Sequence, residues 1–303
     1  MKILSVDDDQ DIISLLAIAL RSQGFDDLAF AVSARAAIAE IQTAQTPFDC
    51  FLLDIQMPEI DGVELCQQIR ELPGYEETPI IMLTAKTDGD STDSSFASGA
   101  TDYITKPIEV SELSERILKA ERLSRKLDGS SAETENGPPS NTTGVDLLAP
   151  LRLLNVRGLV SELSLHNYLS QLARIDDYEV SAVCVRLENA CEVSQQLPIG
   201  EFYNLLAAVA DGIINNIGND APILSYLAVG NFILMMRDRE EVDTTKIVKT
   251  VDSILRDYLP TNTQHAVCVV GDPVGYQQHS EDTCGVIRAA IQSAATKNSQ
   301  PID

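Results

Sequence analysis

The feature of this sequence that most limits its fold is an alternation, from residue 1 to about 125, between short apolar runs and segments with helical periodicity. The runs are short for buried helices and are typical of strands that are buried on both faces. Apolar side chains that recur every three or four residues are typical of amphipathic helices. Because parallel strands need a crossover connection, usually a helix, the alternation predicts a parallel sheet wrapped by helices on both faces.

Residues 1–127 are therefore expected to form one doubly wound domain with five strands and five helices. The expected strands are 2–6, 28–31, 48–53, 79–84 and 102–104. The first helix lies between the first two strands and ends near Gly24, a residue suited to a helix C-terminus. The other helices are expected over 33–45, with Ser33 as the N-cap, and over 63–72, 91–98 and 111–127.

Residues 128–144 contain no large apolar side chain. Their Gly, Pro, Ser, Asn and Thr side chains cannot bury enough surface to offset the entropy lost on ordering. We therefore predict a flexible linker between two domains, and 303 residues are enough for each domain to have its own core.

Residues 145–303 are expected to form a second domain of the α+β class with a central antiparallel sheet. Helices are expected near 147–174, 201–217, 241–259 and 281–296, and strands at 179–187, 223–229, 231–237 and 264–270. The tight connection at Gly230-Asn231 predicts a hairpin, because these two residue types favour tight turns.

Composition limits the partners of the chain. It carries 46 acidic and 22 basic residues, and residues 150–303 alone carry 19 acidic and 11 basic ones. This charge repels nucleic acid and anionic membranes unless basic residues cluster, and the sequence has no such cluster. It also lacks a signal-peptide pattern and an apolar stretch long enough to cross a bilayer. We predict a cytoplasmic protein with reduced cysteines and with neither a nucleic-acid nor a membrane partner.

Polar residues of complementary chemistry follow four of the expected strands in the first domain. They are Asp7-Asp8-Asp9, Asp54, Thr84 and Lys106-Pro107. The carboxyl ends of parallel strands meet at one edge of the sheet, where doubly wound folds bind their ligands. Carboxylates that converge there repel one another unless a hard divalent cation lies among them, so we expect Mg²⁺ as a cofactor.

These residues resemble the receiver domain of two-component response regulators. The motifs that carry the resemblance are VDDD (6–9), DIQMPEIDG (54–62), Thr84-Ala85 and DYITKP (102–107). All of them occur in order at strand ends, over about 120 residues. The resemblance implies a flavodoxin-like fold in which Asp54 accepts a phosphoryl group from a histidine kinase or a phosphotransfer protein.

The resemblance also implies which residues bind the metal ion. Asp8, Asp54 and the backbone carbonyl of Gln56 would bind Mg²⁺, and Asp7 would act largely through water. With three consecutive aspartates, a register shifted by one residue is the alternative.

Three further residues have roles implied by the resemblance. Lys106 and Thr84 would stabilise the negative charge of the phosphoryl group during transfer. Tyr103 would move inward when Asp54 is phosphorylated and would change the surface formed by the fourth helix, fifth strand and fifth helix. The Lys106-Pro107 peptide bond is expected to be cis, which would direct the lysine into the site.

The second domain resembles a diguanylate cyclase (GGDEF) domain over about 140 residues, with a signature reduced to AVGNF at 228–232. Joining two GTP molecules requires metal ions held by carboxylates. The resemblance places metal-binding acidic positions at Gly230 and Arg186, although a two-residue shift would place Glu188 at the second position. The Arg-x-x-Asp motif of the inhibitory cyclic-di-GMP site is also absent from the sequence. We therefore predict a degenerate GGDEF-like domain without cyclase activity.

The sequence thus predicts a response regulator rather than an enzyme. Phosphorylation of Asp54 would change what the second domain contacts, either an unknown downstream protein or a second copy of the chain. A phosphorylation-controlled diguanylate cyclase and a non-catalytic receptor for GTP or cyclic-di-GMP are the alternatives. A receiver that is never phosphorylated is a further alternative, and a transcription factor is disfavoured by the acidic second domain.

Overall fold

The computed structural model describes residues 1–85, 88–130, 153, 156, 158–175, 178–217, 223–237, 243–259, 267–276 and 284–297. The chain divides into two compact units, Met1–Glu133 and Thr134–Asp303. Each unit has its own sheet and its own hydrophobic core.

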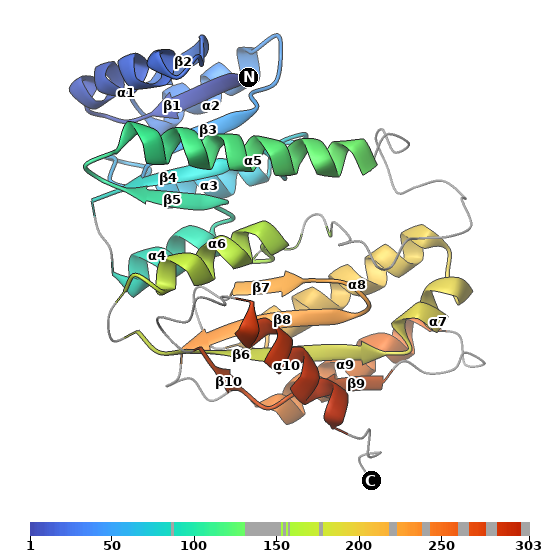
Figure 1. Cartoon of the computed structure of the whole chain (residues 1–303). Helices are drawn as coiled ribbons and strands as arrows, with labels where there is room; N and C mark the ends of the chain where they lie inside the picture. The colour runs from blue at the N-terminus through green and yellow to red at the C-terminus, as the bar shows by residue number, and fades with distance from the viewer. Residues whose placement is uncertain are drawn as a thin grey trace. The chain divides into compact units, whose positions relative to one another are not determined.

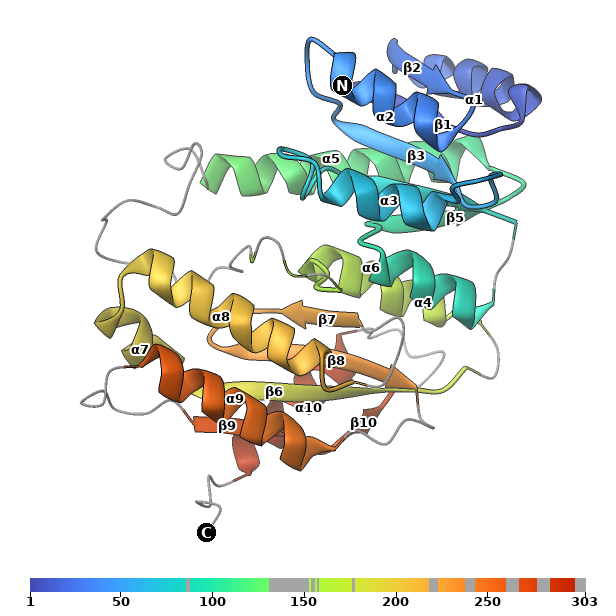
Figure 2. The ribbon, with the colours of Figure 1, turned by 180° about the vertical axis from the view of Figure 1, so that it is seen from behind.

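The first unit is a five-stranded parallel sheet flanked by helices (Figure 1). Its strands, in the spatial order β2-β1-β3-β4-β5, are β1 (Lys2–Val6), β2 (Asp27–Ala31), β3 (Cys50–Asp54), β4 (Ile80–Thr84) and β5 (Asp102–Thr105). Its helices are α1 (Gln10–Ser22), α2 (Ala34–Thr43), α3 (Gly62–Arg70), α4 (Gly89–Ala97) and α5 (Val110–Ser130). Helices α1 and α5 lie on one face of the sheet, and α2 and α3 cover the other (Figures 1 and 2). The predicted flavodoxin-like sheet is confirmed.

Burial explains why the middle strands read as continuous apolar runs. Every residue of β3 and β4 is buried, because helices cover both faces of the sheet. The core under α1 and α5 is formed by Ile3, Leu16, Leu20, Leu52, Ile81, Leu83, Ile104, Leu113 and Ile117. This packing fixes the strands whose ends carry the polar residues.

Local signals set several helix ends. The Ser33 side chain accepts a hydrogen bond from the Ala36 N–H and caps α2, as predicted. Gly24 follows α1 with φ +87°, a left-handed conformation that glycine adopts easily. Helix α5 continues to Ser130, three residues beyond its predicted end and into the predicted linker. The rest of that linker, 131–144, lies outside the described residues.

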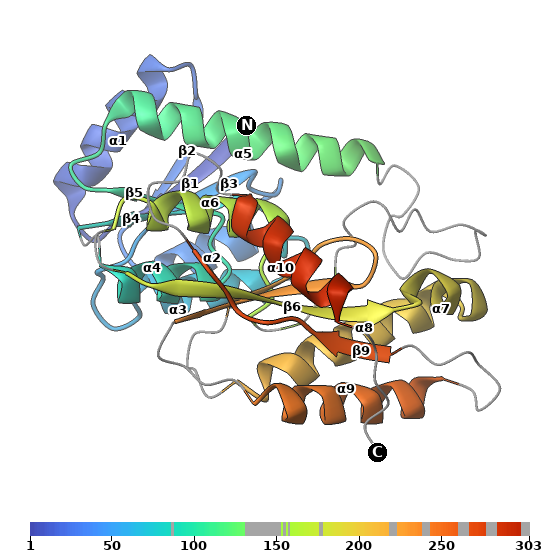
Figure 3. The same ribbon diagram turned by 60° about the horizontal axis from the view of Figure 1, so that its bottom comes forward.

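The second unit contains an antiparallel sheet, as predicted. Its strands are β6 (Val180–Glu188), β7 (Ile223–Tyr226), β8 (Asn231–Arg237), β9 (Val267–Val270) and β10 (Val274–Gly275). The order is β10-β6-β8-β7, and β9 also pairs with β6. Its helices are α6 (Glu162–Leu172), α7 (Ala190–Gln196), α8 (Ile199–Ile214), α9 (Thr244–Tyr258) and α10 (Gly285–Thr296). Figure 2 shows α8 and α9 on one face of the sheet, and Figure 3 shows α10 on the other.

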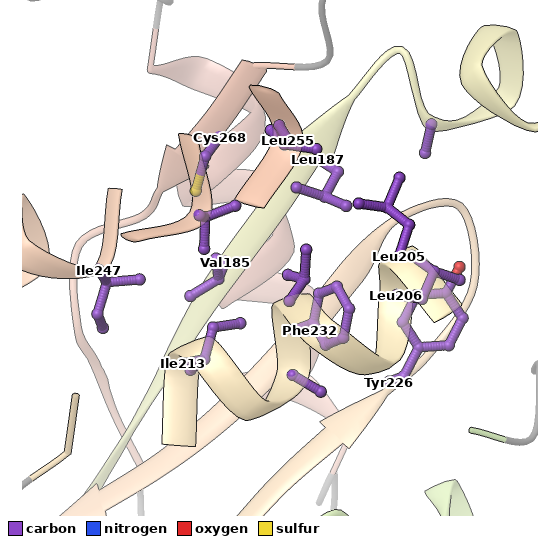
Figure 4. Close-up of a cluster of buried hydrophobic side chains, with 14 of the residues drawn as sticks. Val185, Leu187, Leu205, Leu206, Ile213, Tyr226, Phe232, Ile247, Leu255 and Cys268 are labelled. Atoms are coloured by element: carbon purple, nitrogen blue, oxygen red, sulfur yellow. The ribbon is translucent and has the colours of Figure 1, made fainter. Parts of the chain in front are cut away.

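The main core of the second unit lies between the sheet and helices α8 and α9. Figure 4 shows side chains from three sources that meet there: Val185, Leu187 and Phe232 from the sheet, Leu205, Leu206 and Ile213 from α8, and Ile247 and Leu255 from α9. Because side chains alternate along a strand, Arg186 points to the face opposite Val185 and Leu187.

The hairpin differs from its prediction in one respect. Strand β7 ends at Tyr226, not at residue 229, and the turn has positive φ at Val229 (+56°) and Gly230 (+76°). Two consecutive positive φ angles cannot continue a strand and are typical of a type I′ hairpin turn. Helix α7 and strand β10 were not predicted. Helix α6 begins at Glu162, so residues 158–161 of the predicted helix 147–174 are not helical, while residues 147–152, 154, 155 and 157 lie outside the described ones.

Among the described residues, none of the helices combines the length and the apolarity needed to cross a membrane.

Candidate functional site

Three carboxylates converge at the C-terminal edge of the first sheet. Asp7 and Asp8 follow β1, and Asp54 is the last residue of β3. One carboxylate oxygen from each lies within 4.8 Å of the others. Asp7 and Asp54 are buried, whereas Asp8 is exposed. The adjacent parallel strands β1 and β3 thus bring Asp54 close to Asp7 and Asp8, which lie at least 46 positions earlier in the sequence.

Lys106 links two of these carboxylates. Its Nζ donates to Asp54 Oδ1 at 2.7 Å and to Asp7 Oδ2 at 2.9 Å. The Lys106 N–H donates to the carbonyl of Thr84 at 2.7 Å, which anchors the lysine backbone beside the end of β4. The Lys106-Pro107 bond is cis, as predicted.

The electrostatics of Asp54 are set by opposing effects. Burial raises the pKa of its carboxyl, and the negative charges of Asp7 and Asp8 raise it further, while the hydrogen bond from Lys106 lowers it. The net pKa is above the ordinary value of 3.8. Burial alone would lower the pKa of Lys106, but its hydrogen bonds to Asp54 and Asp7 outweigh burial and raise it. The lysine therefore stays charged at neutral pH.

The donor set fits a hard divalent cation. Three carboxylates and one ammonium group leave an excess of negative charge among clustered oxygen ligands. Oxygen ligands of this kind suit Mg²⁺. Gln56 lies two residues after Asp54 with an exposed side chain, and the binding role of its carbonyl stays a prediction.

The loop after Asp54 folds back tightly against the end of β3. Gly62 begins α3, and its N–H donates to the carbonyl of Ile55 at 3.0 Å. A Cβ at Gly62 would overlap the carbonyl oxygen of Asp54. Only glycine therefore permits this close approach, which explains its place in the motif.

Thr84 and Tyr103 lie where the sequence predicts them. Thr84 is buried at the end of β4, and Tyr103 is buried in the middle of β5. The Tyr103 ring packs edge-on against Phe96 of α4, with 6.1 Å between ring centroids. The Thr92 hydroxyl of α4 lies 3.3 Å from the Tyr103 hydroxyl. Sequence reasoning did not identify Thr92, although its place in the helix before β5 made contact with that strand plausible.

In the second unit, Arg186 lies beside the hairpin. It is opposite Asn231 in the ladder between β6 and β8, while Glu188 pairs with Val267 of β9. The Arg186 Nε is buried and has no hydrogen-bond partner among the described residues. A guanidinium group therefore stands where the GGDEF resemblance places a carboxylate.

The backbone of Gly230 is fully engaged by the protein itself. Its N–H donates to the Tyr226 hydroxyl at 3.2 Å, and its carbonyl accepts from the Leu187 N–H at 2.9 Å. A Cβ at this position would lie 2.7 Å from the Ala190 Cβ and 2.7 Å from the Leu187 carbonyl oxygen. There is no space for an acidic side chain without movement of these neighbours.

All six cysteines are free thiols. Burial raises the pKa of Cys50, Cys184 and Cys268 to about 12. These thiols stay protonated at neutral pH and are not nucleophiles. The prediction of reduced cysteines is consistent with this arrangement.

Residues 3–118 match the family model of the response regulator receiver domain. Similar curated proteins include the transcriptional regulatory protein SpaR of Bacillus subtilis, 40% identical over 129 residues, and protein RcaC of Microchaete diplosiphon, 37% identical over 118 residues. The DNA-binding response regulator MtrA of Mycobacterium tuberculosis is 38% identical over 118 residues.

These alignments cover part of each protein. They include 40% of this chain and 53% of SpaR, 38% of this chain and 48% of MtrA, and 39% of this chain and 18% of RcaC. The chain therefore spans about half the length of SpaR and MtrA and less of RcaC.

Solved structures of response regulators are similar to part of the chain. A putative response regulator from Chloroflexus aurantiacus is 34% identical, and the match covers 40% of this chain and 97% of that one with a TM-score of 0.38. The chemotaxis protein CheY4 of Vibrio cholerae is 31% identical, and the match covers 39% of this chain and 97% of that one with a TM-score of 0.37.

Proposed function

Because residues 3–118 form a response regulator receiver domain, we propose that the chain is the response regulator of a two-component phosphorelay and that Asp54 accepts the phosphoryl group. The observation that carries this proposal is the buried Asp54 carboxylate, held 2.7 Å from Lys106 Nζ beside the carboxylates of Asp7 and Asp8. The phosphodonor would be a phosphohistidine of a histidine kinase or phosphotransfer protein.

The geometry supports in-line transfer to Asp54. A carboxylate oxygen of Asp54 would form the new O–P bond while the P–N bond to the imidazole breaks and its electron pair stays on the nitrogen. Lys106 and Thr84 would stabilise the charge on the phosphoryl oxygens. A bound Mg²⁺, held by the carboxylates and the Gln56 carbonyl, would supply further charge neutralisation.

We further propose that the second domain is not a cyclase and acts through protein interaction or dimerisation. Arg186 supports this, because its guanidinium cannot bind a metal cation. Gly230 supports it as well, because it supplies no carboxylate and has no space for one. The Gly230 N–H is already bound by Tyr226 and so is not offered to a nucleotide.

We propose no DNA binding for this chain. The names of SpaR and MtrA describe transcriptional regulation and DNA binding, but their alignments cover 40% and 38% of this chain. Residues 150–303 carry 19 acidic and 11 basic residues, a balance that disfavours contact with phosphates.

Incubation of the full-length protein with acetyl phosphate and Mg²⁺, followed by intact-mass measurement, tests phosphoryl acceptance. We expect the wild type and the surface control Asp27→Asn to gain one phosphoryl group and Asp54→Asn to gain none. Equal uptake by Asp54→Asn, or no uptake by the wild type, would exclude the proposed role of Asp54.

The second domain is tested with GTP and Mg²⁺ or Mn²⁺, with and without acetyl phosphate. We expect no cyclic-di-GMP in either condition. Clear production would favour the phosphorylation-controlled cyclase, and binding of GTP or cyclic-di-GMP in equilibrium dialysis without turnover would favour the receptor alternative.

A further inference from the structure

The Thr92 hydroxyl connects Tyr103 to the first turn of α4. Its Oγ1 lies 3.3 Å from the Tyr103 hydroxyl and 3.0 Å from the carbonyl oxygen of Asp88. Threonine has one hydroxyl proton, and a carbonyl oxygen can only accept. The Thr92 hydroxyl is the donor in both contacts, so its one proton is shared between the Tyr103 hydroxyl and the Asp88 carbonyl. This shared hydrogen bond links the three groups.

Both residues of the Thr92–Tyr103 contact are buried, so water cannot replace the hydrogen bond between them. Thr92 is 2% exposed and Tyr103 is 4% exposed. A buried phenol hydroxyl needs a hydrogen-bond partner, because an unpaired one loses its solvation without compensation. The Thr92 hydroxyl lies within reach when the ring is packed against Phe96. Thr92 thus favours the inward position of Tyr103.

The connected groups lie on segments that also reach the phosphoacceptor site. Asp88 is the N-cap of α4, where its side chain accepts from the Ser91 N–H at 2.8 Å, and it lies four residues after Thr84. Tyr103 of β5 lies three residues before Lys106, which directly follows the last residue of that strand. A displacement of α4 at its first turn is therefore transmitted to Tyr103 through Thr92.

We propose that Thr92 is a positioning residue that holds Tyr103 inward before any phosphoryl group is bound and couples it to the N-terminal turn of α4. The inward positioning of Tyr103 is argued from the hydrogen bonds alone. The coupling to phosphorylation rests on the proposed function of Asp54. Loss of one net hydrogen bond should lower the ratio of inward to outward Tyr103 about fivefold.

The test is ¹⁹F NMR of the full-length protein labelled with fluorotyrosine, without phosphodonor. The Tyr103 signal is assigned by its loss in Tyr103→Phe. We expect Thr92→Val to move this signal toward that of an exposed tyrosine, and Thr92→Ser, which keeps the hydroxyl, to restore it.

Ser95→Ala is the matched control. Ser95 is also a buried α4 residue, and its hydroxyl donates to the carbonyl four residues earlier, that of Ser91, at 2.7 Å. We expect the Tyr103 signal of this variant to equal that of the wild type. An unmoved Tyr103 signal in Thr92→Val, or an equal displacement in Ser95→Ala, would overturn the proposal.

Initial rates of phosphorylation by acetyl phosphate then test the coupling. We expect Thr92→Val to be slower by up to the same factor of about five, with Thr92→Ser and Ser95→Ala close to the wild type. Equal rates in Thr92→Val and wild type would refute the coupling. If the wild type takes up no phosphoryl group, the proposed function fails, while the NMR result still decides the inward positioning.

Discussion

Replacing Lys106 by Met removes the cation that links Asp7 and Asp54 while keeping much of the side-chain length. In the wild type, the two hydrogen bonds from Nζ measure 2.7 and 2.9 Å. Each hydrogen bond to a charged group contributes about 1.5–3 kcal/mol. The Lys106 side chain is 21% exposed, so solvent screens part of this interaction. We expect the free energy of local unfolding to fall by about 3 kcal/mol at neutral pH.

The loss should depend on pH and on Mg²⁺. Without Lys106, burial and the repulsion between Asp7 and Asp54 would raise the pKa of the Asp54 carboxyl further, so the charged form becomes more costly. The destabilisation should therefore shrink as the pH falls toward the ordinary carboxyl pKa of 3.8. Added Mg²⁺ should recover part of the loss at neutral pH by binding the carboxylates.

Hydrogen exchange of the full-length protein, read by mass spectrometry on peptides from β3 and β4, reports the local free energy. Lys249→Met, an exposed lysine of α9, is the matched control and should leave these peptides unchanged. The double variant Lys106→Met/Asp54→Asn should recover much of the loss. Unchanged protection in Lys106→Met at neutral pH would refute the electrostatic reasoning.

Three further perturbations are expected to change stability. Burial raises the pKa of Asp54, so the favourable contribution of its protonated form is lost as the pH rises through the folded pKa. Asp54→Asn should unfold at a higher temperature than the wild type at pH 7, and the difference should vanish toward pH 3.8 in a calorimetric pH series. Arg70→Met should lower the free energy of local unfolding by about 3 kcal/mol, measured by hydrogen exchange of peptides from β4 and β5. The reason is that the Arg70 guanidinium donates to the carbonyls of Gly99, Tyr75 and Thr78 at 2.7–2.9 Å. Val229→Asn should stabilise the hairpin by about 1 kcal/mol, measured by hydrogen exchange of peptides from β8. Asparagine tolerates the positive φ of +56° at this position better than a β-branched residue does.

The first sheet was predictable because its strands are buried on both faces. A strand such as β3, in which every residue is buried, appears in the sequence as an uninterrupted apolar run that ends at a polar residue. Since parallel strands align their carboxyl ends, the same pattern also placed Asp7, Asp54 and Lys106 at one edge. The contacts of Lys106 with both carboxylates agree with that expectation.

The second unit shows where sequence reasoning fails. Strand β7 ends before the apolar run does, because the chain turns back at Val229 and Gly230 with positive φ angles that no apolar pattern encodes. Helix α7 has seven residues, Ala190–Gln196, which is too short for a clear helical periodicity, and its N-cap Asn189, with φ +61°, makes no side-chain cap. Strand β10 has two residues, too few for a pattern.

Tertiary contacts account for the site residues that the sequence did not reveal. Thr92 and Arg70 act through partners 11 and 29 residues away, Tyr103 and Gly99. No local pattern marks such pairs, because residues far apart in the sequence meet only in the folded chain.

Chemical trapping of the acyl phosphate identifies the carboxylate that accepts the phosphoryl group. The full-length protein is phosphorylated with acetyl phosphate and Mg²⁺, reduced with borohydride to convert a phosphoaspartate to homoserine, and mapped by peptide mass spectrometry. We expect homoserine at position 54 and unmodified aspartate at positions 7 and 8. Homoserine at position 7 or 8, or no reduced residue despite phosphodonor and Mg²⁺, would contradict the proposed role of Asp54.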